Sequence, residues 1–284
     1  MLKIISAGFN ASIQDLGRIG FASIGVPVSG VMDQYATQLA NHLLQNNKND
    51  AVLEIPFATC KFLFEKESFV CITGADFSAK INNNQIQLQT VIKVNKGDLL
   101  SFGKRKYGVR TYLAISGGFQ SEIKLKSRSF YTGITQDSIL KKGMNLLYRK
   151  NNTLKTKSHS ILKIQEKHFN VKELLCYEGP EYYLLSKSQK QELLSSQFTI
   201  SDKNNRMGYQ LQETIQNNLK SILTSAVLPG TVQLTPSGKL IVLMRDCAVT
   251  GGYPRVLQLS DTAINQLAQK QTRGKLFFKI IFIQ

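Results

Sequence analysis

The sequence AVLEIPFATCKFLFEKESFVCIT, residues 51–73, contains three short apolar runs, AVLEI, KFLF and FVCIT. Turn-forming or charged residues separate the runs, each of which is rich in aliphatic or aromatic side chains. Strands recurring at a spacing of about 8–12 residues are typical of an antiparallel sandwich or barrel. Similar runs continue downstream as VIKV, DLLSF, VRTYLAIS, QFTI, TVQL, LIVLM and RVLQL. The pattern therefore predicts a mainly β protein and not a parallel α/β sheet.

A few helices are expected among these strands. Apolar residues of MDQYATQLANHLLQN (32–46) form one stripe at helical spacing, and Asp33 is a suitable N-cap. EYYLLSKSQKQELLSS (181–196) also predicts a helix, as does SDTAINQLAQKQ (260–271) with Ser260 as its cap. INNNQIQL (81–88) predicts a hairpin that turns on its asparagines. The fold class is thus mainly β with a few helices (α+β).

Composition limits the classes of protein to consider. The 284 residues are 42% hydrophobic, enough for a sizeable core, and no apolar run approaches the ~18 residues of a transmembrane helix. MLKIISAGFN, at the start, predicts a strand and not a signal peptide, so we expect a cytoplasmic protein. The four cysteines are widely spaced, which favours reduced, buried thiols and gives no reason to expect a metal site.

The chain is strongly basic, with 36 Lys and Arg against 19 Asp and Glu, a net charge of +17. Its densest basic stretch lies at about 141–165 and predicts an exposed loop connecting an N-terminal lobe (about 1–145) to a C-terminal lobe (about 166–284). We expect the two lobes to form a single domain over 1–284. No nucleic-acid-binding motif is visible, so a lysine-rich solvated surface is the favoured interpretation.

Common catalytic motifs are missing from the sequence: there is no P-loop, nucleophile elbow, HExxH zinc motif or dinucleotide GxGxxG. This excludes a stand-alone ATPase, a zinc hydrolase and a triad esterase. Three clusters of polar residues and glycines remain as candidate sites: SIQDLGRIGFASIGVPVSGVMD (12–33), NRMGYQL (205–211) and DCAVTGGYPRV (246–256).

The last two clusters predict one pocket. Glycine permits close approach of a ligand to the backbone, and N–H groups on such a loop can bind a carboxylate or carbonyl oxygen. Arg206 would pair with a substrate carboxylate, and Asp246 would act in proton transfer or orient a donor. The alternative is that the glycines only shape a tight turn, which Asp246 caps. The candidate residues are Arg206, Asp246 and Tyr253 for catalysis and Thr250, Gly251 and Gly252 for substrate binding.

At these clusters the chain resembles the allophanate hydrolase subunit 2 family, also described as KipA-like, biotin-dependent carboxyltransferase domains. The resemblance runs in order through GADFSAKI, GVRTYLAISGGF, SRSFY, YEGPEY, NRMGYQL, SAVLPGTVQLTPSGKLIVLMRD and TGGYP. It implies a cyclophilin-like β-barrel with an additional N-terminal β-rich lobe. The family includes the C subunit of bacterial 5-oxoprolinase, which free-standing members most resemble.

The resemblance also implies an activity and partners. The expected function is that of the C subunit in an ATP-dependent 5-oxoprolinase complex, which converts 5-oxo-L-proline to L-glutamate together with A-like and B-like subunits. ATP would be used by the complex, with no cofactor bound by this chain, no nucleic acid and no membrane. One alternative is a carboxyltransferase-type subunit of a urea- or amide-metabolising enzyme, in which biotin takes part. The other is a non-catalytic regulator that binds a cyclophilin-like kinase-inhibitor partner.

The stretch 12–33 resembles the family's loop between the first strand and the first helix. Gln14, Asp15 and Arg18 would be its polar contacts to substrate, with bracing through an Asp15–Arg18 contact as the alternative. The chain departs from the family pattern at Lys126 and Phe130, which replace a glycine and a threonine, and at Ala248 and Val249, which replace polar side chains. The exact substrate therefore stays open at this stage.

Overall fold

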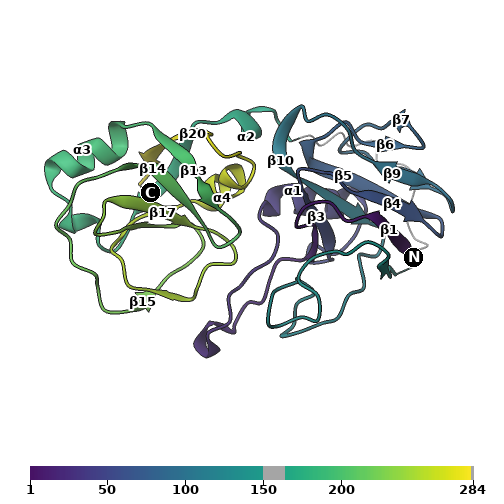
Figure 1. The fold of residues 1–284 in the computed structure, drawn as a ribbon, viewed down its shortest axis with the longest axis horizontal. Coiled ribbons are helices and arrows are strands. Elements are labelled where there is room, and N and C mark those ends of the chain that lie inside the picture. Colours follow the sequence, from purple (N-terminus) through teal and green to yellow (C-terminus); the bar gives the residue numbers. More distant parts are fainter. Residues whose placement is uncertain (150–163, 283–284) are drawn as a thin grey trace. The chain divides into compact units, whose positions relative to one another are not determined.

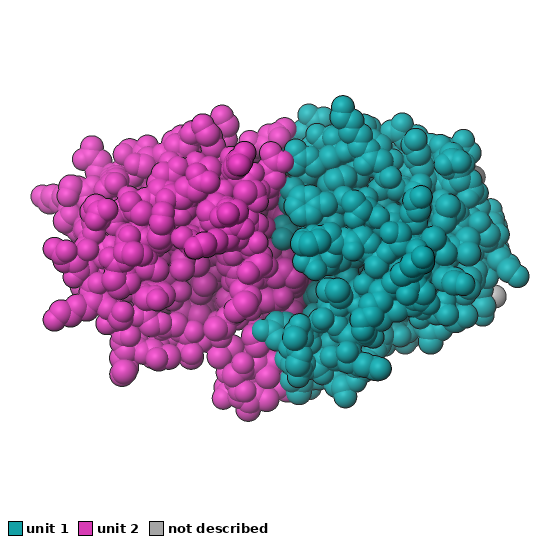
Figure 2. Space-filling view, in the orientation of Figure 1, with its two compact units in different colours: residues 1–18, 33–169 teal, residues 19–32, 170–284 magenta. Residues whose placement is uncertain are grey.

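The computed structural model describes residues 1–149 and 164–282. The chain divides into two compact units, of which the first holds residues 1–18 and 33–169 and the second holds 19–32 and 170–284. Figure 2 colours the units separately. The segment 19–32 was predicted as part of the N-terminal lobe, but it belongs with the second unit. Of the predicted basic loop at 141–165, residues 150–163 lie outside the described residues.

The first unit contains two antiparallel sheets (Figure 1). Side chains of both sheets form one hydrophobic core. The sheet with strand order β11-β1-β4-β9-β6-β7 consists of β1 (Leu2–Ser6), β4 (Lys61–Phe64), β6 (Lys80–Ile81), β7 (Asn84–Gln85), β9 (Leu99–Ser101) and β11 (Asn145–Leu146). The sheet with strand order β2-β3-β10-β5-β8 consists of β2 (Ser12–Gln14), β3 (Val52–Pro56), β5 (Ser68–Asp76), β8 (Ile92–Val94) and β10 (Tyr107–Ile115).

Helix α1 (Gln34–Leu43) packs against β5 and β10 of the second sheet. It begins as predicted, because Asp33 Oδ1 accepts a hydrogen bond from Ala36 N at 3.0 Å. The hairpin predicted at 81–88 is present as β6 and β7, and Asn82 and Asn83 between them have positive φ angles of 49° and 68°. Asparagine tolerates this left-handed conformation better than most residues, which explains the turn.

The second unit is a closed barrel with strand order β12-β19-β16-β17-β14-β13-β20 (Figure 1). All neighbours described are antiparallel except β12 and β20, which are parallel. The strands are β12 (Glu173–Glu178), β13 (Phe198–Asn204), β14 (Gly208–Thr214), β16 (Thr231–Leu234), β17 (Lys239–Leu243), β19 (Arg255–Leu259) and β20 (Lys275–Ile280), beside a separate pair, β15 (Ser225–Ala226) and β18 (Thr250–Gly251).

Three further helices are described: α2 (Lys167–Asn170), α3 (Lys187–Ser195) and α4 (Asp261–Ala268). The prediction of a single helix over 181–196 is wrong in its extent. This segment forms a 3-10 turn (Tyr182–Leu184) followed by the helix α3. Ser186 stops the continuation by capping α3, with its hydroxyl accepting from Gln189 N. Strands β12 and β14 were not predicted. Ser260 caps α4 as predicted.

The stretch 19–32 contributes directly to the barrel unit. Met32 is fully buried in the barrel core, and Ser29 N donates to the carbonyl of Arg245 at 2.9 Å. The stretch therefore leaves the first unit after Arg18 and returns to it at Asp33; its second half is buried in the barrel unit, whereas Ile19 and Ile24 in its first half are exposed. In the part of the chain that the structure describes, no helix combines the length and the apolar character needed to cross a membrane.

Candidate functional site

The carboxylate of Asp15 is buried and ties the opening stretch to the SRS segment of unit one. Its Oδ1 accepts from Gly17 N at 2.8 Å, Ser127 Oγ at 2.6 Å and Ser129 Oγ at 2.7 Å. Its Oδ2 accepts from Arg128 N at 2.6 Å. A buried carboxylate with this many donors fixes two loops relative to each other.

The side chains of Arg18 and Gln14 also form hydrogen bonds with other residues of unit one. The fully buried Arg18 donates through Nη2 to the carbonyl of Ser129. Gln14 donates to Ser12 Oγ at 3.0 Å and to the carbonyl of Phe130 at 3.2 Å. Bracing is therefore the geometry that the structure provides, and it runs through residues 127–130. Substrate contact by these residues remains a prediction.

Arg206 and Asp246, predicted to share a pocket, lie together and form a bidentate ion pair. Arg206 Nε lies 2.7 Å from Asp246 Oδ2, and Nη2 lies 2.9 Å from Oδ1. The same guanidinium donates to the carbonyl of Gly30 at 2.5 Å, and Asp246 N donates to the carbonyl of Arg206 at 2.8 Å. The pair thus joins the turn between β13 and β14 to the loop after β17.

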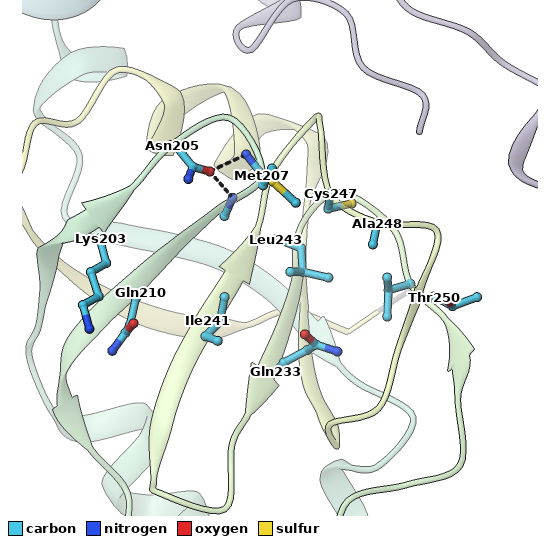
Figure 3. Close-up of a pocket in the computed structure, with 12 residues that line it drawn as sticks. Lys203, Asn205, Met207, Gln210, Gln233, Ile241, Leu243, Cys247, Ala248 and Thr250 are labelled. Atoms are coloured by element: carbon cyan, nitrogen blue, oxygen red, sulfur yellow. Dashed lines mark hydrogen bonds between the residues drawn. The ribbon is translucent and has the colours of Figure 1, made fainter. Parts of the chain in front are cut away.

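A pocket of about 290 Å³ opens beside this pair, on the outer face of the barrel (Figure 3). It lies outside because Tyr209, Leu211, Leu240 and Val242 point into the barrel core, so the alternate residues of β14 and β17 face outward. The pocket is lined by Lys203, Asn205, Met207, Gly208, Gln210, Val227, Gln233, Ile241, Leu243, Cys247, Ala248 and Thr250.

Of the predicted site residues, Thr250 is one of the twelve that line the pocket. Tyr253, 37% exposed, is not in that set, and neither are Arg206 and Asp246, which are sequence neighbours of lining residues. Ala248, flagged as a departure from the family pattern, does line it. A methyl group there in place of a polar side chain makes this wall of the pocket more apolar.

Gly251 and Gly252 follow Thr250 but are not among the lining residues, and backbone pairing holds their segment in place. Strand β18 pairs with β15, Ile222 N donates to the carbonyl of Gly252 at 2.9 Å, and Val227 N donates to the carbonyl of Val249 at 3.1 Å. A Cβ added at Gly251 would lie 2.4 Å from Gln233 Nε2. Glycine at 251 therefore leaves the end of the Gln233 side chain in its present place, and a larger residue would displace it.

Cys247 supplies a thiol to the pocket lining, but this thiol is not activated as a nucleophile. Burial, and secondarily the charge of Asp246, raises the pKa of its thiol to about 12. Because the thiolate is the nucleophilic form of cysteine, the thiol is inert at neutral pH. Within residues 1–149 and 164–282, no group of three or more His, Cys, Asp or Glu side chains could hold a metal ion.

Sequence reasoning missed a second ion pair of the barrel. Arg255 donates to Glu181 through Nε at 2.8 Å and Nη2 at 2.7 Å. These hydrogen bonds lower the pKa of the Glu181 carboxyl. A Cβ on Gly179 would lie 2.1 Å from the Arg255 carbonyl oxygen, so the backbones approach closely. The sequence offered a signal for this pair, because Glu181 lies within EGPEY and Arg255 within TGGYPR, and both motifs contain glycine.

The barrel carries an outer pocket beside an arginine–aspartate pair and a TGGYP loop. The chain that folds in this way matches one family pattern over most of its length. The pattern described as carboxyltransferase domain, subdomain A and B, matches residues 24–280. The chain therefore belongs to the carboxyltransferase domain family, which confirms the predicted family.

Two relatives and one solved structure show which proteins of known name this chain is similar to. The 5-oxoprolinase C subunit of Escherichia coli (strain K12) is 31% identical over 275 residues, which cover 95% of this chain and 87% of that relative. The 5-oxoprolinase C subunit of Haemophilus influenzae is 27% identical and covers 100% of this chain and 92% of the relative. The solved urea amidolyase of K. lactis is similar in fold, with a TM-score of 0.86 and 24% identity over 98% of this chain. The chain spans 18% of that protein.

Proposed function

We propose that this chain is the C subunit of a 5-oxoprolinase-type complex, which opens 5-oxo-L-proline to L-glutamate with hydrolysis of ATP. The observation that carries the proposal is the 31% identity to the 5-oxoprolinase C subunit of E. coli, extending over 95% of this chain and 87% of the relative. The similarity extends along nearly the whole of both chains. This favours the same role for the two proteins over a single domain that two proteins of different roles have in common.

The chain's own residues support binding and orientation of a small substrate. Thr250 lines the pocket and can donate to a carbonyl oxygen of a ligand, whereas the amides of Gly251 and Gly252, which follow it but are not among the lining residues, stay predicted contacts. Arg206 and Asp246 engage each other, so we assign the pair to positioning the pocket loop, and Tyr253 stays a predicted contact. We assign ATP use to the A-like and B-like partner subunits, because the sequence has no phosphate-binding loop.

The test is to co-express the chain with the A-like and B-like partner subunits and to assay glutamate release from 5-oxo-L-proline. We expect ATP-dependent release from the complex and none from the isolated chain, which lacks a recognisable pair of base and nucleophile. Turnover by the purified chain alone, or a complex whose activity is unchanged when this chain is omitted, would contradict the proposal.

A second candidate function is favoured by one observation, the fold shared with urea amidolyase at a TM-score of 0.86. In that case the chain is a carboxyltransferase-type subunit that accepts a biotin carrier from a partner. Sensitivity of the assembled complex to avidin distinguishes the two, because the 5-oxoprolinase reaction as proposed uses no biotin.

A further inference from the structure

One polar side chain of the pocket has a buried amide nitrogen without a hydrogen-bond partner. Gln233 lies in the middle of β16, is 5% exposed and lines the pocket. Its Nε2 has no hydrogen-bond partner among the described atoms. A buried donor left unsatisfied destabilises a protein by about 1–3 kcal/mol, so such a group calls for an explanation.

The position of Gln233 directs its amide into the pocket. Val232 and Leu234 on either side of it belong to the barrel core, so Gln233 points to the outer face. Figure 3 shows its side chain among the pocket residues, on the side of Thr250, with Lys203 and Gln210 on the opposite side. Gly251 allows Nε2 its present position, because a Cβ at residue 251 would displace this end of the side chain.

The surroundings suit a small, partly apolar ligand with an acceptor atom. Ile241 and Leu243 supply apolar surface, and the volume of about 290 Å³ lies just below the ~300–1,000 Å³ of ordinary ligand pockets, which suits a small ligand. Lys203, exposed at the other side of the pocket, adds a positive charge. A buried N–H donor in such a site rejects analogues that lack its acceptor.

We propose that Gln233 is the specificity-determining residue of this pocket, donating from Nε2 to the carbonyl oxygen of a small cyclic amide. The choice of a cyclic amide rests on the proposed function. The unpaired amide and the glycine that makes room for it are observations independent of that function.

The experiment measures binding of two probes to the full chain by calorimetric titration. 5-Oxo-L-proline carries the ring carbonyl, and L-proline has the same ring and carboxylate without it. The variants are Gln233→Leu and Gln233→Glu, and Gln212→Leu and Gln212→Glu are matched controls, because Gln212 is exposed on β14 and outside the pocket lining. We expect about a tenfold loss of 5-oxo-L-proline affinity in both Gln233 variants, and no change in the controls.

Thermal unfolding separates recognition from a structural role. Gln233→Leu removes an unpaired buried amide, so its midpoint should equal or exceed that of the wild type. A lowered midpoint, unchanged 5-oxo-L-proline affinity, an equal loss for L-proline, or no binding by the wild-type chain at millimolar probe would each overturn the inference. Turnover by the complex without Gln233-dependent binding refutes the inference alone. Gln233-dependent binding without turnover refutes the proposed function alone.

Discussion

Replacing Asp15 by Asn tests whether the opening stretch braces the fold. The Asn side chain keeps the shape of Asp but loses its charge, and it has one acceptor oxygen in place of two. That oxygen can take the place of Oδ1, which accepts from Gly17 N, Ser127 Oγ and Ser129 Oγ. The amide NH₂ then faces Arg128 N, which donates to Oδ2 at 2.6 Å in the wild type.

The size of the effect follows from these contacts. Leaving the part-buried Arg128 N–H without an acceptor costs an amount at the low end of the about 1–3 kcal/mol of a buried donor. The other three hydrogen bonds also weaken, because bonds to a charged group contribute ~1.5–3 kcal/mol and neutral ones ~0.5–1.5 kcal/mol. We expect a total loss of about 3 kcal/mol, a large fraction of the ~5–15 kcal/mol that stabilises an ordinary domain.

Urea denaturation measures the loss, and amide hydrogen exchange locates it. Peptides from residues 11–18 and 127–131 should exchange faster in Asp15→Asn, whereas barrel peptides from 231–243 should not change. Glu67→Gln is the control, because it removes the same charge from an exposed pair with Lys93 at 3.7 Å, worth ~0–1 kcal/mol. If Asp15→Asn lowered the activity of the complex without changing its stability, the bracing argument would be refuted. Contact between Asp15 and the substrate would then be the favoured interpretation.

Three other predictions concern the barrel site, the cysteines and the partner. Asp246→Asn and Arg206→Ala should each lower kcat/KM of the complex at least ~10-fold, about 1.4 kcal/mol, with an unchanged circular dichroism spectrum, because the pocket loop loses its bidentate anchor. Burial raises the pKa of all four cysteine thiols from 9.0 to about 12, so iodoacetamide should label none of them in the folded chain at pH 8. Since the unfolded thiols release their protons first, the free energy of unfolding should fall as the pH rises from 9 toward 12. With a net charge of +17, association with a B-like partner subunit should slow steeply with added salt while dissociation changes little, and stopped-flow rates indifferent to salt would contradict this.

The fold could be predicted from sequence wherever local signals decide it. Asp33 and Ser260 cap their helices as predicted, and the apolar runs of residues 51–73 became β3, β4 and β5. Strand β14 escaped prediction because its glycine and polar residues face the outer surface, which makes the run look like a loop.

The site was only partly predictable, because sequence shows residue types and not their partners. The sequence predicts Arg206 and Asp246 in one site, and the two residues do lie together. Their bidentate ion pair was not predicted, and it engages the guanidinium that was expected to bind a substrate carboxylate. Gln233 was not singled out at all, because a lone glutamine in TVQL carries no motif. Its importance comes from burial, a missing partner and a distant glycine, which are properties of the folded chain.

The assignment of residues 19–32 to the barrel unit has a consequence for synthesis of the protein. Met32, a core residue of that unit, leaves the ribosome well over a hundred residues before the last barrel strand, β20 at Lys275–Ile280. Domains generally fold as units while the chain is still growing. Here the second unit cannot be complete until nearly the whole chain has emerged, so residues 19–32 must wait in an unfinished state. A genetic cut after residue 32 or after residue 169 would separate this segment from the barrel strands that it packs against.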